Sequence, residues 1–288
     1  AGQRGGAAKR GQGQGAALIV GMDGIGLFTQ NLVTGRPEYP AGRWIFINGN
    51  NTPRVARIDL RTFETAEIIE LPNSAGNHSS PFITPNSEYI VAGTRFSLPI
   101  PNQDVPIDTY KDNFKGTVSF ISIDKEDGNM DIAFQIILPG FNFDLSHAGK
   151  GPSDGWFFFS CYNTELAHTL LEINASQNDK DFILAINWKK AEELIRDGKF
   201  NEIETEYFNN EYDETTHTAT SNRLTKVKTI TAKDSEGLAY LIPCPKSPHG
   251  CDVDPSGEYI VGGGKLATVI PVFSFSKMIK AIEGKSFD

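Results

Sequence analysis

The chain has few cysteines and no long hydrophobic run. Its 288 residues include three cysteines, Cys161, Cys244 and Cys251, and none of them forms a CxxC pair. Three cysteines do not make a disulfide framework, and their spacing is a weak basis for a zinc site. We therefore expect them to be small buried residues. No run of about 18 apolar residues occurs, so no transmembrane helix is expected.

Basic residues are also scarce. The 27 Lys and Arg residues are outnumbered by 36 Asp and Glu residues, which gives a net charge of -9. This balance argues against a nucleic-acid-binding surface. No Gly-rich loop follows a strand and opens a helix, and no GxSxG elbow occurs, so nucleotide-binding and serine-hydrolase functions have no support. The remaining composition, with 39% hydrophobic residues, is that of a globular protein with a large core.

A repeated segment is the most informative feature that is present. Residues 78–91 (HSSPFITPNSEYIV) and 249–261 (HGCDVDPSGEYIV) each contain a histidine, a short strand, a Pro-containing turn and a Glu-Tyr-Ile-Val strand. A repeated supersecondary unit suggests a repeat architecture. Histidines at matching points of two units can aim two imidazoles at one shared centre. His78 and His249 are therefore candidate metal ligands on the axis of a propeller.

Short strands separated by turns account for most of the chain after Gly42. They fall into four units, at residues 43–71, 89–138, 155–187 and 239–275. The first unit is predicted to have strands at 43–47, 55–60 and 65–71, and the last unit is predicted to end in a strand at 268–275. A single helix is expected at residues 189–197, where Gly198 is a natural residue to end it. We predict an all-β fold, a β-propeller with about four antiparallel four-stranded blades and one short helix.

Two stretches depart from this pattern. Residues 1–41 are rich in glycine and are expected to be a poorly ordered or atypical N-terminal segment, although residues 17–20 suit a strand. Residues 42–288 are expected to form one partial propeller domain. Within it, residues 201–235 are acidic, then rich in threonine, with little periodicity. We interpret them as an insertion or an excursion between blades.

Six motifs carry a resemblance to a known family. They are GRWIFIN at 42–48, RVARID at 54–59, GKGPSDGW at 149–156, YNTE at 162–165, PKSPHG at 245–250 and GKLxTV at 264–269. In these motifs and their order, the chain closely resembles nitrous oxide reductase, the multicopper enzyme of denitrification. The resemblance implies a seven-bladed propeller with a sulfide-bridged four-copper cluster on its axis. It also implies a C-terminal cupredoxin domain with a dinuclear copper centre, which we expect to lie beyond Asp288.

The same resemblance implies an activity and a setting. The family reduces nitrous oxide by two electrons to dinitrogen and water, works as a periplasmic homodimer, and takes electrons from small cytochromes or cupredoxins. Its cluster has seven histidine ligands. His78 and His249 match two of these positions, and five are not found here. We therefore expect this chain to be a partial piece that does not reduce nitrous oxide alone.

A calcium site is also implied by the resemblance. Glu165 and the backbone carbonyl of Tyr162 match its ligands by motif, and Asp181 matches with less support. Ser247 replaces an asparagine that is common at that position in the family. Calcium prefers such a shell of carboxylate and carbonyl oxygens. The other histidines, His147, His168 and His217, fall on no ligand position, and for them we expect ordinary structural roles.

An alternative class of function is a non-enzymatic propeller that binds a partner or serves as a scaffold. One fold supports many functions, and His78 and His249 would then be relics or core residues. Convergence of the two imidazoles on one axial cavity favours the copper enzyme, whereas divergence favours the binding module. A third possibility, a calcium-stabilised structural fragment, needs only the Glu165 loop.

Overall fold

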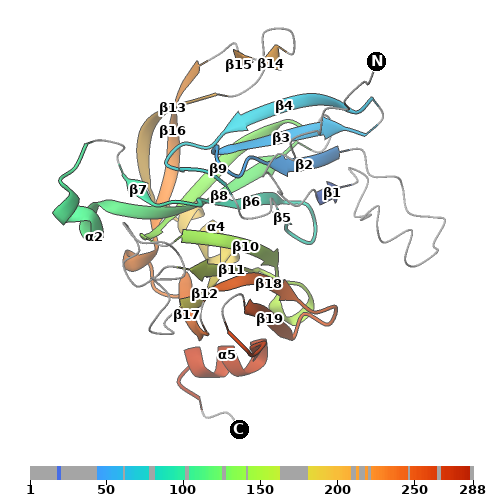
Figure 1. Cartoon of the computed structure of the whole chain (residues 1–288), viewed down its shortest axis with the longest axis vertical. Coiled ribbons are helices and arrows are strands. Elements are labelled where there is room, and N and C mark those ends of the chain that lie inside the picture. Colours follow the sequence, from blue (N-terminus) through green and yellow to red (C-terminus); the bar gives the residue numbers. More distant parts are fainter. Residues whose placement is uncertain are drawn as a thin grey trace, which may run out of the picture.

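The computed structural model describes residues 18–20, 44–60, 62–77, 82–100, 104–124, 128–140, 142–162, 181–208, 212–213, 218–219, 222–245, 247–264 and 267–285. The described chain is mainly β-sheet with few helices, so the predicted all-β class is confirmed. Four main sheets follow one another through the described residues, from the blue strands near the N-terminus to the red strands near the C-terminus, and a fifth sheet has only two short strands (Figure 1). No described helix is long and apolar enough to cross a membrane.

The first sheet is a four-stranded antiparallel meander in chain order. Its strands are β1 (Leu18–Val20), β2 (Trp44–Asn48), β3 (Arg54–Asp59) and β4 (Glu64–Glu70). β2 alternates buried and half-buried residues, as a strand with one core face should. The strands predicted at 43–47, 55–60 and 65–71 are confirmed to within one residue at each end.

The second sheet is built on a second meander and is extended at one edge. The meander consists of β5 (Phe82–Ile83), β6 (Tyr89–Gly93), β8 (Phe114–Ile123) and β9 (Met130–Pro139), and β7 (Leu98–Pro99) pairs with β8. The link before β8 holds η1 (Ile107–Thr109) and the short helix α2 (Tyr110–Asn113). The far edge of β9 pairs in parallel with β16, through residues 135–137 and 229–231.

The third sheet corrects one part of the prediction. Its antiparallel order is β10 (Asn142–Ala148), β11 (Trp156–Tyr162), β12 (Asp181–Asn187) and β17 (Ala239–Cys244). We predicted that residues 239–242 begin the fourth unit. Instead β17 pairs with β12, with Asp181 opposite Cys244. The chain thus leaves the sheet after β12 and returns to complete it, a connection that no local pattern reveals.

The fourth sheet has three described strands and ends in a helix. The strands are β18 (Pro248–Val253), β19 (Tyr259–Gly264) and β20 (Val272–Ser274), followed by α5 (Phe275–Ile282). The expected strand at 268–275 is therefore too long, and the expectation of a single helix is wrong. Ser274 caps α5, because its side chain accepts a hydrogen bond from the Lys277 N–H.

The predicted helix at 189–197 is confirmed as α4 (Trp188–Arg196). The Asn187 side chain caps its first turn by accepting from the Lys190 N–H. Ala191 and Leu194 are buried on its apolar face. Gly198 has a φ of 72° after the last turn, the left-handed conformation in which glycine commonly ends a helix.

The predicted excursion is a long β-hairpin. It contains β13 (Asn201–Phe208) and β16 (Asn222–Thr231), with β14 (Tyr212–Asp213) and β15 (Thr218–Ala219) between them. η4 (Ala232–Asp234) leads back toward β17. The β13 carboxylates face the β16 lysines across the hairpin, with Lys226 Nζ 3.7 Å from a Glu204 oxygen. The hairpin covers the edge of β9, which would otherwise expose unpaired backbone groups.

Three apolar cores separate the four sheets. Trp44, Phe46 and Ile69 of the first sheet pack against Ile90 and Ile121 of the second. A larger core joins the second and third sheets and includes α4, and a third core joins the third and fourth sheets. Within β11, Phe157 and Phe159 enter the core on one side while Trp156 and Phe158 enter the core on the other. This double burial explains why β11 is an apolar run rather than an alternating strand.

The repeated segments form equivalent turns. The Thr84 N–H donates to the Tyr89 carbonyl at 3.0 Å, and the Asp254 N–H donates to the Tyr259 carbonyl at 2.9 Å. The Thr84 hydroxyl and the Asp254 carboxylate each accept from the N–H of the same tyrosine, at 3.0 and 2.9 Å. The third sheet has a turn closed in the same way, by the Gly149 N–H and the Trp156 carbonyl at 2.8 Å.

Gly257 is the turn glycine whose replacement should matter most. Its φ is 77°, and a Cβ there would lie 1.8 Å from the Lys150 carbonyl oxygen in the neighbouring turn. Gly198 has a similar φ of 72°, but a Cβ there would meet nothing within 4 Å. We expect Gly198→Ala to lower the free energy of unfolding by about 1 kcal/mol from backbone strain alone. Gly257→Ala should lower it by about 2 kcal/mol, because the added Cβ also meets the Lys150 carbonyl oxygen. Urea unfolding of both variants measures the difference, and equal costs would contradict the close approach.

Candidate metal centre

His249 lies opposite a buried carboxylate of the neighbouring sheet. Its Nδ1 is 3.5 Å from Oδ2 of Asp144, whose side chain is 4% exposed, while the His249 side chain is 44% exposed. Asp144 lies in β10, and His249 lies in β18. Both residues sit where the strand register shifts, between Phe143 and Ser146 and between Pro248 and Gly250. Bulges of this kind redirect side chains near functional sites.

Asp144 occupies in the third sheet the place that His249 occupies in the fourth. Each residue lies five positions before the residue that closes the equivalent turn, Gly149 in one case and Asp254 in the other. Asp144 was not predicted from the sequence, because the third turn, Gly149 to Trp156, is two residues longer than the other two and has Gly-Trp in place of their Glu-Tyr. The equivalence becomes visible only when the turns of the third and fourth sheets are aligned by their hydrogen bonds.

Several predicted residues lie outside the described part of the chain. These are His78, Glu165, His168 and His217, and the side chain of Tyr162 belongs to the same group. The proposed convergence of His78 with His249 therefore stays a prediction. The backbone of Tyr162 is described and ends β11.

His147 joins the same two strands as Asp144 and His249. Its Nδ1 accepts a hydrogen bond from the Val253 N–H at 2.8 Å and lies 3.4 Å from Oδ1 of Asp252. The neighbouring His147 side chain lowers the pKa of the Asp252 carboxyl. Because the Val253 N–H already uses Nδ1, this histidine ties β10 to β18. His147 lies within β10, in the structural role expected for it.

Asp181 is a fully buried carboxylate at the start of β12. Its Oδ2 accepts a hydrogen bond from the Ser247 N–H at 2.6 Å. Ser247 is also buried and has a φ of 47°, an unusual conformation for a residue other than glycine. Asp181 therefore holds the turn that leads to Pro248 and His249. A buried, hydrogen-bonded carboxylate at this point is the type of donor that calcium requires.

All three cysteines are buried and free, as the composition suggested. Burial raises the pKa of the Cys161 and Cys251 thiols well above the usual value. Burial, aided by the nearby charge of Asp181, raises the pKa of Cys244 to about 11. These thiols are therefore protonated near neutral pH and act as small apolar groups of the core.

The residues that the structure describes do not complete a metal site by themselves. Among them, no group of three or more His, Cys, Asp or Glu residues could hold a metal ion. What they supply is one imidazole with a carboxylate at its Nδ1, and one buried carboxylate at Asp181. The first suits a copper ligand and the second suits a calcium ligand, so the donor types present fit the two metals.

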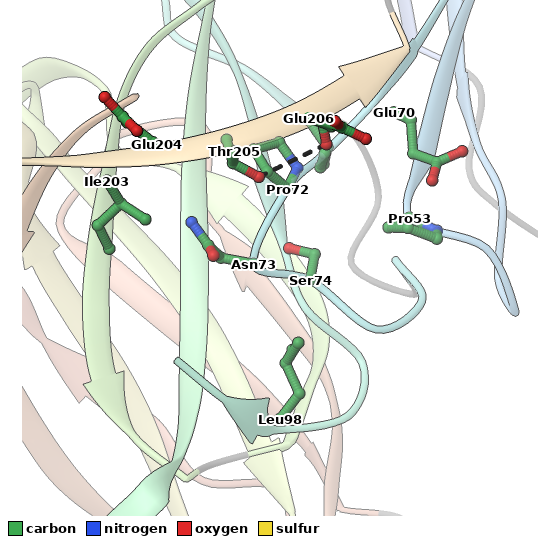
Figure 2. Close-up of a pocket in the computed structure, with 11 residues that line it drawn as sticks. Pro53, Glu70, Pro72, Asn73, Ser74, Leu98, Ile203, Glu204, Thr205 and Glu206 are labelled. Atoms are coloured by element: carbon green, nitrogen blue, oxygen red, sulfur yellow. Dashed lines mark hydrogen bonds between the residues drawn. The ribbon is translucent and has the colours of Figure 1, made fainter. Parts of the chain in front are cut away.

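A separate cleft of about 320 Å³ lies where β4, β7 and β13 meet. Figure 2 shows Asn73 and Ser74 on its floor below the strand that carries Glu204, Thr205 and Glu206. The Asn73 amide is fixed by a hydrogen bond to the Gln135 side chain at 3.0 Å. None of the predicted ligands lines this cleft.

Known proteins resemble this chain over most of its length. Over 240 residues it is 30% identical to the nitrous-oxide reductase of Pseudomonas fluorescens, a match that covers 82% of this chain and 34% of that protein. The chain is a relative of nitrous-oxide reductase. It is also 27% identical over 250 residues to the nitrous-oxide reductase of Stutzerimonas stutzeri, covering 86% of this chain and 35% of that protein. The chain thus spans about a third of the length of these curated nitrous-oxide reductases.

Other comparisons add little to the link with nitrous-oxide reductase. No protein-family model matches the chain. A putative 6-phosphogluconolactonase from Bacteroides uniformis superposes with a TM-score of 0.45 at 14% identity, covering 81% of this chain and 47% of that one. The periplasmic gluconolactonase of Pseudomonas aeruginosa gives 0.33 at 11% identity, covering 80% and 64%. TM-scores at this level do not establish a shared fold. The fold described above is defined by the strand pairing.

Proposed function

We propose that this chain is part of a nitrous oxide reductase, a copper-dependent oxidoreductase. In this proposal the four sheets are consecutive blades of a seven-bladed propeller, and β5, β10 and β18 are inner strands. The observation that carries the proposal is the position of His249. It lies on β18, at the motif position of a copper ligand, with the Asp144 carboxylate 3.5 Å from its Nδ1. The sequence relation to nitrous-oxide reductases supports the same assignment.

His249, with His78, would hold copper in the intact protein. Copper held there would supply redox chemistry and Lewis acidity toward the substrate. The carboxylate of Asp144 favours the imidazole tautomer with its proton on Nδ1 and the lone pair on Nε2. This tautomer suits a metal ligand, because Nε2 is then free of a proton. Asp144 therefore acts on the ligand rather than on the substrate.

The overall reaction adds two electrons and two protons to nitrous oxide and releases dinitrogen and water. The electrons would come from a small cytochrome or cupredoxin, in a homodimer located in the periplasm. Asp181, Glu165 and the Tyr162 carbonyl would hold calcium. Burial of Asp181 and its bond to the Ser247 N–H support a structural role for that site, because they connect it to the turn before His249.

Copper(I) titration of the purified chain tests this proposal. We expect X-ray absorption to detect imidazole nitrogen bound to copper and His249→Ala to remove that signal. Asp144→Asn should weaken copper affinity about tenfold, as the loss of an outer carboxylate partner commonly does. His147→Gln is the matched control, because the Nδ1 of His147 already accepts the Val253 N–H. Equal copper binding by wild type and His249→Ala would overturn the proposal.

The same preparation should not reduce nitrous oxide. Only His78 and His249 match ligand positions, so the chain loaded with copper and sulfide should show no reductase activity with a reduced dye as electron donor. Dinitrogen formed by this polypeptide alone would contradict the expectation.

A further inference from the structure

One buried hydroxyl contacts both of the strands that carry Asp144 and His249. Ser160 lies in β11 and is fully buried. It points to the same side of β11 as Trp156 and Phe158, toward the fourth sheet. Its Oγ accepts a hydrogen bond from the Leu145 N–H at 3.0 Å and lies 3.0 Å from the His249 carbonyl oxygen. It also lies 3.2 Å from the Leu145 carbonyl oxygen.

The hydrogen bonds of this hydroxyl can be assigned from its valence. A serine hydroxyl has a single proton to donate, so it serves one of the two carbonyl groups at a time. The His249 carbonyl is the nearer acceptor, at 3.0 Å against 3.2 Å for Leu145. Ser160 therefore accepts from the bulge of β10 and donates to the bulge of β18. One side chain fixes the relative position of two irregular strands at the points where they carry Asp144 and His249.

We propose that Ser160 is a positioning residue for the His249 imidazole. The contact between His249 Nδ1 and Asp144 is long, at 3.5 Å, so a small shift of either bulge changes it. A bulge has no regular ladder to hold its backbone, and the hydroxyl supplies that restraint. The role of the His249 imidazole as a copper ligand rests on the proposed function. The positioning itself follows from the contacts of Ser160.

Nitrogen NMR of the histidine rings tests the inference in Ser160→Ala. The ring ¹⁵N shifts of a neutral imidazole report which nitrogen carries the proton, and spectra are recorded at about pH 8, above the ordinary pKa of histidine. We expect His249, assigned with His249→Gln, to hold its proton on Nδ1 in the wild-type chain and to show a mixture of tautomers in Ser160→Ala. Copper(I) affinity should fall about tenfold in the same variant. An unchanged His249 tautomer in folded Ser160→Ala would overturn the proposal.

Ser119→Ala is the matched control. Ser119 is also fully buried, and its hydroxyl accepts a hydrogen bond from the Gln135 side chain at 2.8 Å, within the second sheet. Loss of the Ser119 hydroxyl should lower stability without changing the ¹⁵N spectrum of His249. The comparison therefore separates a general loss of stability from a specific effect on the His249 imidazole. Ser160→Thr keeps the hydroxyl and should retain the wild-type tautomer.

A measurement on the wild-type chain keeps the inference testable even if Ser160→Ala does not fold. The Ser160 hydroxyl proton should show a coupling through the hydrogen bond to the His249 carbonyl carbon. A coupling to Leu145 instead would overturn the assignment. A wild-type chain that fixes the His249 tautomer but binds no copper would leave the positioning role standing and refute the proposed function.

Discussion

Glu67→Gln should lower the free energy of unfolding by about 3–5 kcal/mol, because it removes the buried carboxylate that faces the buried guanidinium of Arg57. Arg57 and Glu67 face each other on β3 and β4, with side chains 5% and 0% exposed and Nε 3.2 Å from Oε2. Glu67 also accepts from the Met130 N–H, at 2.9 and 3.1 Å to its two oxygens. The pair thus connects the first sheet to the second. Urea unfolding at neutral pH measures the loss.

The same two strands supply the control. Arg54 and Glu70 form a pair with a shorter distance of 2.8 Å, but their side chains are 45% and 26% exposed. Glu70→Gln should cost below about 1 kcal/mol, because exposed pairs are screened by water and salt. Similar losses for Glu67→Gln and Glu70→Gln would show that burial does not decide the strength of this pair.

Asp181→Ala should lower the free energy of unfolding by about 3 kcal/mol in the absence of calcium. In the presence of calcium the loss should be larger. The first part arises because the buried Ser247 N–H loses a charged acceptor at 2.6 Å. The second part applies if Asp181 helps to bind calcium, since a ligand at a hundred times its dissociation constant stabilises the folded state by about 2.7 kcal/mol. Thermal and urea unfolding with calcium and with a chelator separate the two parts.

The calcium-dependent part of the stability loss tests whether Asp181 binds calcium. The wild-type chain should lose stability when calcium is chelated, whereas Asp181→Ala should not respond. Asp112→Ala removes an exposed carboxylate in α2 and should behave like the wild type. A calcium response that survives in Asp181→Ala would contradict the assignment and leave Asp181 with its structural hydrogen bond alone.

The prediction succeeded where neighbours in sequence determine structure. The first meander and α4 were placed within one or two residues, because alternation, turn residues and helix caps act over a few positions. The equivalence of the turns at Thr84 and Asp254 also followed from their shared residues. These features repeat or terminate local patterns, and those patterns are visible in the chain.

The prediction failed where distant residues decide. β17 was assigned to the wrong sheet because its partner, β12, lies about fifty to sixty residues earlier in the chain. The hairpin at 201–231 looked irregular, since its glutamates and lysines balance across two strands rather than along one. α5 was missed because Val272 and Phe273 continue a strand-like pattern up to the cap at Ser274.

The residues of the candidate site show the same distinction between local pattern and tertiary packing. The sequence alone selected His249 and Asp181 by repeat and motif, and it determined the apolar strands that fill the cores. Only the tertiary structure placed Asp144 beside His249, and Ser160 between their two bulges, because residues about 90 to 105 positions apart meet where the third and fourth sheets pack. Local patterns set which segments become strands. The packing of one sheet on the next sets which side chains face each other, and no short-range pattern encodes that arrangement.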